Sequence, residues 1–305
     1  MENEIEVPWS EHTVVKKSEL LENLSDAGEW REDKIKTSSF IVSPSYGTLD
    51  YDGFVSFLRN KFMFFALSED EIQESERPHL EAQQLSDYRD DAKMDGKWGE
   101  LILFTMVEGF LDIPMMSHKL GWKQNPTDQV KGSDGLFFGE YEGSPTLGIG
   151  EAKMYTDLDD GIEEALDSTD RFHGEDSQLR NQHELTVAMG NPSDNLSKEK
   201  IELLSSLFTG ESQDYQMLHP IFVGYEDEEL EEFQTKPVED DQELVDQLQD
   251  HVEDTDLLSK VTDSLEGDYS HLRKHWLTFF FLPLEDKDRF VENVKAAIYP
   301  WTTNH

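Results

Sequence analysis

Three residues near the middle of the chain combine two carboxylates with a lysine, at a spacing that would place them together. Glu151 and Lys153 end the β-like stretch from Thr146 to Lys153. Because side chains alternate across a sheet, both lie on the same face of this predicted strand. The stretch from Gly135 to Glu140 precedes it across a turn, and antiparallel pairing of the two would bring Asp134 beside Glu151. The spacing therefore predicts a cluster of two acids and one ammonium group.

Such a cluster is suited to metal-assisted chemistry. Converging carboxylates form a hard oxygen site that fits Mg²⁺ or Mn²⁺, so Asp134 and Glu151 are the predicted metal ligands. A bound ion lowers the pKa of a bound water and polarises a phosphoryl oxygen, while Lys153 can orient that water or stabilise developing negative charge. Phosphodiester hydrolysis uses all of these groups. Glu100, at the start of a predicted apolar helix, is expected to add a further carboxylate.

The acid-x-Lys pattern is short, so its context decides what it means. With 67 acidic residues, about four matches are expected by chance. The chain has five, and four of them lie in polar segments or at a predicted strand-to-helix turn, beginning at Glu32, Asp91, Asp95 and Glu285. Only the match at Glu151 lies inside an apolar β-like run with an Asp in its hairpin partner. The alternative interpretation is an ordinary surface ion pair at the end of a strand.

The segment from Ile113 to Ser133 is unusually basic for this chain. It holds Lys119, Lys123 and Lys131 against a single acidic residue. The segment abuts Asp134, where a phosphate backbone would need neutralising contacts. These lysines are therefore predicted to bind nucleic acid. An ordinary exposed loop is the alternative, because three lysines are few for a nucleic-acid surface.

The elements around the cluster predict an α/β protein. The segment from Trp98 to Leu111 is apolar nearly all round, which is typical of a helix buried in a core. Asp157 is the predicted N-cap of a second helix that follows Lys153. Two apolar runs, from His219 to Gly224 and from His275 to Leu284, are predicted buried strands. Strands separated by helices indicate a layered α/β fold.

The length of 305 residues is compatible with one large domain or two small ones. We expect residues 1–94 to form an N-terminal subregion packed on the core, with a helix that carries Phe54, Leu58, Phe62 and Phe65. Residues 95–305 are expected to form the main domain. It includes an acidic helical segment at about 226–270, in which four apolar residues mark one buried helix face: Leu244, Val245, Leu248 and Val252.

The formal net charge of −41 is the strongest feature of the composition. In dilute buffer such a surface repels itself, whereas at molar salt the Debye length falls to roughly 3 Å and the repulsion is screened. We therefore expect a protein adapted to a very salty cytoplasm. The alternative interpretation is a non-catalytic acidic protein that mimics nucleic acid and binds a basic partner.

The absence of cysteine excludes disulfides, thiolate zinc sites and a cysteine nucleophile. Any metal must therefore be bound by oxygen or imidazole. No window approaches the ~20 apolar residues of a membrane span, and the first residues are acidic. A cytoplasmic protein without a membrane partner is expected.

Several blocks of the sequence carry a family pattern; they run from Trp98 to Glu100, from Lys131 to Gly135, from Gly148 to Tyr155 and from Asp157 to Ala165. Together these blocks resemble the HamA family, the nuclease subunit of the Hachiman antiphage defence system. The closing run from Phe279 to Lys287 is similar to the end of that family. The Gly-Glu-Ala-Lys block that contains Glu151 is the most specific piece.

The resemblance implies a PD-(D/E)xK nuclease core, with a mixed central sheet flanked by helices. In that family pattern Asp134, Glu151 and Lys153 take the metal-binding and catalytic roles, and Glu100 assists from its helix. The implied activity is metal-dependent cleavage of DNA. The implied partner is a superfamily 2 helicase, HamB, which restrains the nuclease until damaged or invading DNA is sensed. The acidity departs from this pattern, and a PD-(D/E)xK restriction or repair nuclease is a further alternative.

Overall fold

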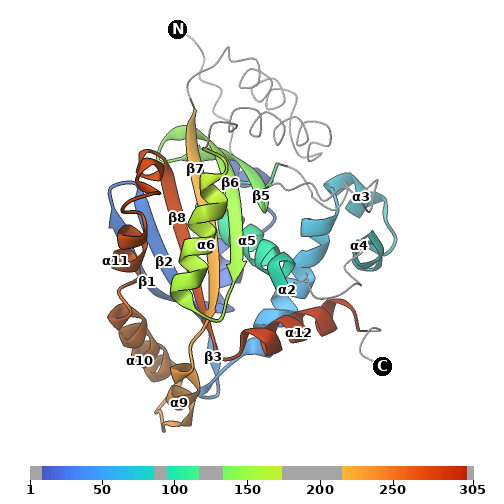
Figure 1. The fold of residues 1–305 in the computed structure, drawn as a ribbon. Helices are drawn as coiled ribbons and strands as arrows, with labels where there is room; N and C mark the ends of the chain where they lie inside the picture. The colour runs from blue at the N-terminus through green and yellow to red at the C-terminus, as the bar shows by residue number, and fades with distance from the viewer. Residues whose placement is uncertain (1–8, 86–94, 117–132, 174–214, 301–305) are drawn as a thin grey trace.

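Six strands form one mixed sheet at the centre of the computed structural model, which describes residues 9–85, 95–116, 133–173 and 215–300 (Figure 1). Their order is β1-β2-β8-β7-β6-β5. The bounds are Leu24–Glu32 for β1, Ile35–Val42 for β2, Gly135–Tyr141 for β5, Ser144–Met154 for β6, Gln216–Glu226 for β7 and Trp276–Leu284 for β8. Two short strands, β3 (Pro44–Ser45) and β4 (Thr48–Leu49), pair separately.

The middle of the sheet is parallel and its edges are antiparallel. Strands β2, β8, β7 and β6 run in one direction, whereas β1 and β5 run against their neighbours. Strand β8 lies in the interior of the sheet, and every residue from Leu277 to Leu284 is buried. This confirms the predicted central strand, because a parallel strand covered on both faces needs an unbroken apolar run.

Helices cover both faces of the sheet (Figure 1). One face packs against α5 (Asp95–Leu111), with α2 (Tyr51–Ala66) and α12 (Lys287–Ile298) around it. The other face is covered by α6 (Leu158–Asp170), α10 (Asp241–Asp254) and α11 (Leu257–Ser264). The predicted α/β architecture, a mixed sheet between helices, is therefore confirmed.

The short helices are η1 (Trp9–His12), α1 (Lys17–Leu21), α3 (Glu69–Glu74), α4 (Pro78–Leu85), α9 (Glu229–Thr235) and η3 (Ser270–Lys274).

The N-terminal segment is part of the central sheet. Strand β2 pairs in parallel with β8, and β1 extends the sheet beyond it. The described part of residues 1–94 supplies one edge of the sheet, and the division of the chain at residue 94 stays a prediction. The predicted helix of this segment is confirmed as α2, which buries the expected apolar residues Phe54, Leu58, Phe62 and Phe65.

The acidic segment forms three helices, α9, α10 and α11, which connect β7 to β8. Helix α10 packs against β1, and its apolar stripe is buried as predicted: Leu244, Val245, Leu248 and Val252. Its carboxylates lie mainly on the opposite, solvent-facing side.

Among the residues that the structure describes, no helix has the length and apolar character that crossing a membrane requires.

Candidate active site

The β5–β6 hairpin places Asp134 opposite Glu151. The two strands pair with Gly135 facing Gly150, which puts the preceding residue, Asp134, next to Glu151. The backbone N–H of Asp134 donates to the Gly150 carbonyl over 2.8 Å. The Asp134 Oδ2 atom accepts the backbone N–H of Ala152 at 2.9 Å. The hairpin register inferred from sequence is therefore confirmed, and the Asp134 carboxylate is fixed directly before the first residue of β5.

Glu151 and Lys153 form an ion pair that is largely shielded from water. The Nζ atom of Lys153 lies 2.6 Å from the Oε1 atom of Glu151, and their side chains are only 18% and 10% exposed. The exposed pair between Lys260 and Asp159 differs, because those side chains are 35% and 68% exposed. Exposed pairs interact weakly across water, whereas charges at a partly buried site interact more strongly. The burial therefore argues against an ordinary surface ion pair.

The environment of Glu151 favours its protonated form. Burial is the main reason that its pKa rises to about 7, and the nearby charge of Asp134 raises the pKa further. Lys153 and a hydrogen bond from Ser168 act in the opposite direction. The influence of Asp134 shows that the two carboxylates are close enough to repel each other. A divalent cation between them would remove this repulsion.

Ser168 is a member of the site that the sequence did not predict. It lies near the end of α6, is 4% exposed, and its hydroxyl donates to the Glu151 carboxylate. Arg171 Nη2 in turn donates to Ser168 Oγ over 3.2 Å. No sequence signal marks Ser168, because its approach to Glu151 depends on how α6 lies on the sheet.

A hydrogen bond between His173, which follows α6, and His219, on β7, connects the end of α6 to the sheet beside this site. His219 is 1% exposed on β7, and its Nδ1 atom lies 3.2 Å from the carbonyl oxygen of Ile149. Because a carbonyl only accepts, Nδ1 carries the proton, and His219 Nε2 accepts from His173 Nε2 at 2.7 Å. Burial lowers the pKa of His219 to about 3, so the ring is neutral at pH 7. This bond holds the segment that carries Ser168.

Glu100 lies on the helix that covers the opposite face of β6. A Cβ atom at Gly150 would come within 2.9 Å of the Leu103 side chain, and one at Gly99 within 3.3 Å of the Ala152 side chain. Helix α5 therefore packs on the Gly150 and Ala152 face of β6. Glu151 faces α6 instead. Glu100 is half-buried near the end of β6, and its assisting role stays a prediction.

The three lysines predicted to bind nucleic acid, Lys119, Lys123 and Lys131, lie outside the described residues. Their role stays a prediction. The described part of this region ends at Met116, which pairs with the start of β5 through its backbone N–H to Leu136. It resumes at Ser133, directly before Asp134.

The donor set of the site fits a hard divalent cation. Asp134 and Glu151 offer carboxylate oxygens, and the repulsion between them would be relieved by positive charge. Among the described residues, no three His, Cys, Asp or Glu side chains converge as a metal-binding group. A two-carboxylate site suits Mg²⁺, which commonly keeps several waters and binds few protein ligands.

The raised pKa of Glu151 predicts how stability depends on pH without metal. Its ordinary pKa is 4.5, and it is about 7 in the folded protein. Between these values the folded state binds more protons than the unfolded state, so this group's contribution to stability falls as the pH rises. Glu151→Gln should remove that loss. The free energy of unfolding of the variant, relative to that of the wild type, should therefore be about 3 kcal/mol higher at pH 7.5 than at pH 4.5.

Urea unfolding in EDTA at both pH values measures this difference. Glu140→Gln is the matched control, because Glu140 is exposed on the neighbouring strand β5. Glu108 is a second buried acid, whose pKa burial also raises to about 7, but it is present in all of these proteins. A difference between Glu151→Gln and wild type that does not change with pH would contradict the prediction.

Comparison with known families gives one match that spans most of the chain. A sequence model described as HamA matches residues 18–298 of the 305 residues. The matched range contains all of the site residues described above and all six strands of the central sheet in full. No curated protein matches the chain in a sequence comparison.

Proposed function

Because the chain belongs to the HamA family and is thereby a component of a Hachiman antiphage defence system, we propose that it is the metal-dependent DNA nuclease of that system. The observation that carries this proposal is the shielded cluster of Asp134, Glu151 and Lys153. A buried acid beside a second acid and a lysine is unfavourable for stability alone, because burial penalises each charge. Such an arrangement is common where a site binds metal or performs chemistry.

Each residue of the cluster has a defined part in phosphodiester hydrolysis. Asp134 and Glu151 would hold Mg²⁺ or Mn²⁺, which when bound supplies an activated water and a positive charge at the phosphoryl group. Glu151 also holds the Lys153 ammonium group at 2.6 Å. Lys153 then stabilises the negative charge that develops on the phosphate. Ser168 fixes the orientation of the Glu151 carboxylate from α6.

The charge of the chain requires help in bringing DNA to this site. A net charge of −41 repels DNA, and high salt weakens the counterion release that drives binding. Delivery by a superfamily 2 helicase, a HamB-like partner, would overcome this repulsion. The non-catalytic DNA mimic is the weaker alternative, because a mimic needs surface carboxylates and has no use for the buried pair of Glu151 and Lys153.

Cleavage of supercoiled plasmid in molar KCl tests the proposal. The reactions contain Mg²⁺, Mn²⁺ or EDTA, with and without the helicase of the same system. We expect nicked or linear product only with a divalent metal, and weak DNA binding by the chain alone. Cleavage that persists in EDTA would contradict metal dependence, and absence of cleavage under every condition would favour the acidic interaction protein.

A further inference from the structure

Tyr46 stands fully exposed at the tip of the β3–β4 turn. Its relative exposure is 100%, and the other exposed large apolar side chain in the described ranges, Leu21, reaches 43%. Tyr46 and Gly47 both have positive φ, of 57° and 81°. Two such residues in succession form the tight turn that joins two short strands, and glycine accepts this conformation readily. A bulky residue does not, and the left-handed conformation costs it roughly 1–2 kcal/mol.

The strained turn is held rigidly from a distant part of the chain. The backbone N–H groups of Tyr46 and Gly47 both donate to Asp241, at 3.2 Å and 2.6 Å. Asp241 is the first residue of α10, so the acidic segment fixes the position of the tyrosine. Strain that the surrounding structure maintains is typical of functional sites. An aromatic ring held in water at such a position is prepared for contact with another molecule.

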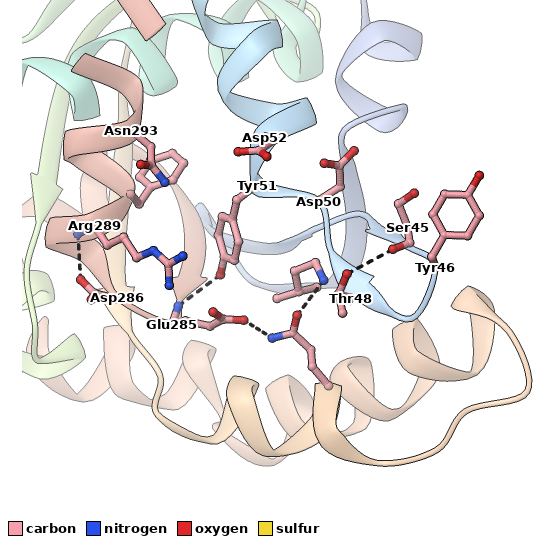
Figure 2. A pocket seen from close by; sticks show the side chains of 13 residues that line it. Ser45, Tyr46, Thr48, Asp50, Tyr51, Asp52, Glu285, Asp286, Arg289 and Asn293 are labelled. Carbon is pink, nitrogen blue, oxygen red and sulfur yellow. Dashed lines mark hydrogen bonds between the residues drawn. The ribbon is translucent and has the colours of Figure 1, made fainter. Parts of the chain in front are cut away.

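A polar pocket opens beside the turn (Figure 2). It has a volume of about 440 Å³ and is walled by the β3–β4 turn and by the first residues of α2 and α12. Hydrogen bonds fix its floor: the Leu49 N–H donates to Gln234 Oε1 at 2.8 Å, Gln234 bonds Glu285, and the Glu285 N–H donates to the Tyr51 hydroxyl at 3.2 Å. The pocket is therefore preformed.

The charges in the pocket favour a basic occupant. Four carboxylates line it, from Asp50, Asp52, Glu285 and Asp286, against the single guanidinium of Arg289. Figure 2 shows Arg289 extending from α12 into the space between them. Among the residues that the structure describes, its guanidinium makes no hydrogen bond or ion pair. The carboxylates of the pocket can thus bind a cationic group, while the Arg289 guanidinium remains available to bind an anionic group.

We propose that this pocket and Tyr46 form the docking site for a basic segment of the helicase partner. A Lys or Arg side chain of the partner enters among the carboxylates, Tyr46 packs against the partner surface, and Arg289 meets a partner carboxylate. Tyrosine and arginine are among the residues most often found at the energetic centre of protein interfaces. The full exposure of the Tyr46 side chain favours a protein over a small ligand, which would be enclosed by apolar walls.

The experiment measures binding of the purified full-length chain to the helicase of the same system, without DNA. The key variant is Tyr46→Asn, because asparagine tolerates positive φ and should preserve or raise the melting temperature. We expect its Kd to rise roughly thirtyfold, as for a central interface residue. Asp52→Lys, which reverses one exposed pocket charge, should also weaken binding. Leu21→Ala is the matched control, and its Kd should equal that of the wild type.

The identity of the partner rests on the proposed function. The experiment measures binding and cleavage separately, so that failure of the docking site can be distinguished from failure of the proposed function. Binding is measured without catalysis, and plasmid cleavage is measured separately on the same variants. Unchanged affinity in both Tyr46→Asn and Asp52→Lys would overturn the docking site, as would the absence of any complex with the wild type. A helicase complex that the variants weaken would support the docking site even if the wild type cleaves no DNA.

Discussion

The variant Glu151→Gln should lose plasmid cleavage, with the single-turnover rate falling at least about 10³-fold. The substitution keeps the size of the side chain but removes the negative charge that would hold the metal. The fold should remain intact, because burial already raises the pKa of Glu151 to about 7, and a neutral side chain suits that environment. Cleavage is measured at saturating Mg²⁺, and folding by circular dichroism and urea unfolding.

The metal affinity of this variant separates loss of chemistry from loss of structure. A Mn²⁺ titration by calorimetry should show much weaker binding than in the wild type. Glu140→Gln, on the exposed side of β5, provides the control and should retain both cleavage and metal binding. If Glu151→Gln cleaved at the rate of the wild type, Glu151 would not be a metal ligand, and the proposed active site would be wrong.

The variant Lys153→Ala should also lose cleavage by about 10³-fold, but for a different reason. Lys153 lies 2.6 Å from Glu151 and carries the positive charge available to the reacting phosphate. Removing it leaves both carboxylates in place and takes away a competing cation. Mn²⁺ should therefore bind the variant at least as tightly as the wild type, although the reaction is slow.

Lys260→Ala is the matched control for this prediction. It also removes a lysine from a close ion pair, at 2.7 Å from Asp159, but that pair is exposed on α11. Its cleavage rate should be unchanged. Retention of cleavage by Lys153→Ala would mean that the ion pair with Glu151 is structural, whereas weaker Mn²⁺ binding would mean that the lysine organises the metal site.

Much of the site's local geometry follows from neighbouring residues in the sequence. The alternation of β6 placed Glu151 and Lys153 on one face, and the turn before it brought Asp134 alongside. Asp157 caps α6 as predicted, accepting the backbone N–H groups of Asp159 and Asp160. These features depend on side-chain periodicity and short-range hydrogen bonds, which act over a few residues.

Local sequence patterns did not predict which face of the sheet each helix covers. The alternation of side chains along β6 separates its two faces but does not identify the helix that covers each. Packing decided that α5 covers the Gly150 and Ala152 face while α6 covers Glu151. Ser168 entered the site for this reason. The place of β1 and β2 in the sheet likewise depends on parallel pairing with β8, which lies more than 230 residues further along the chain.

The sequence by itself determined the chemical cluster, the α/β class and the charge of this protein, because each depends on residue type and on spacing within one element or one hairpin. Only the tertiary structure decided the shielding of Glu151, its contact with Ser168 and the pocket beside Tyr46. These features bring together segments such as Tyr46 and Asp241, which are 195 residues apart. Contacts of this kind arise from packing of whole elements, and no local pattern encodes them.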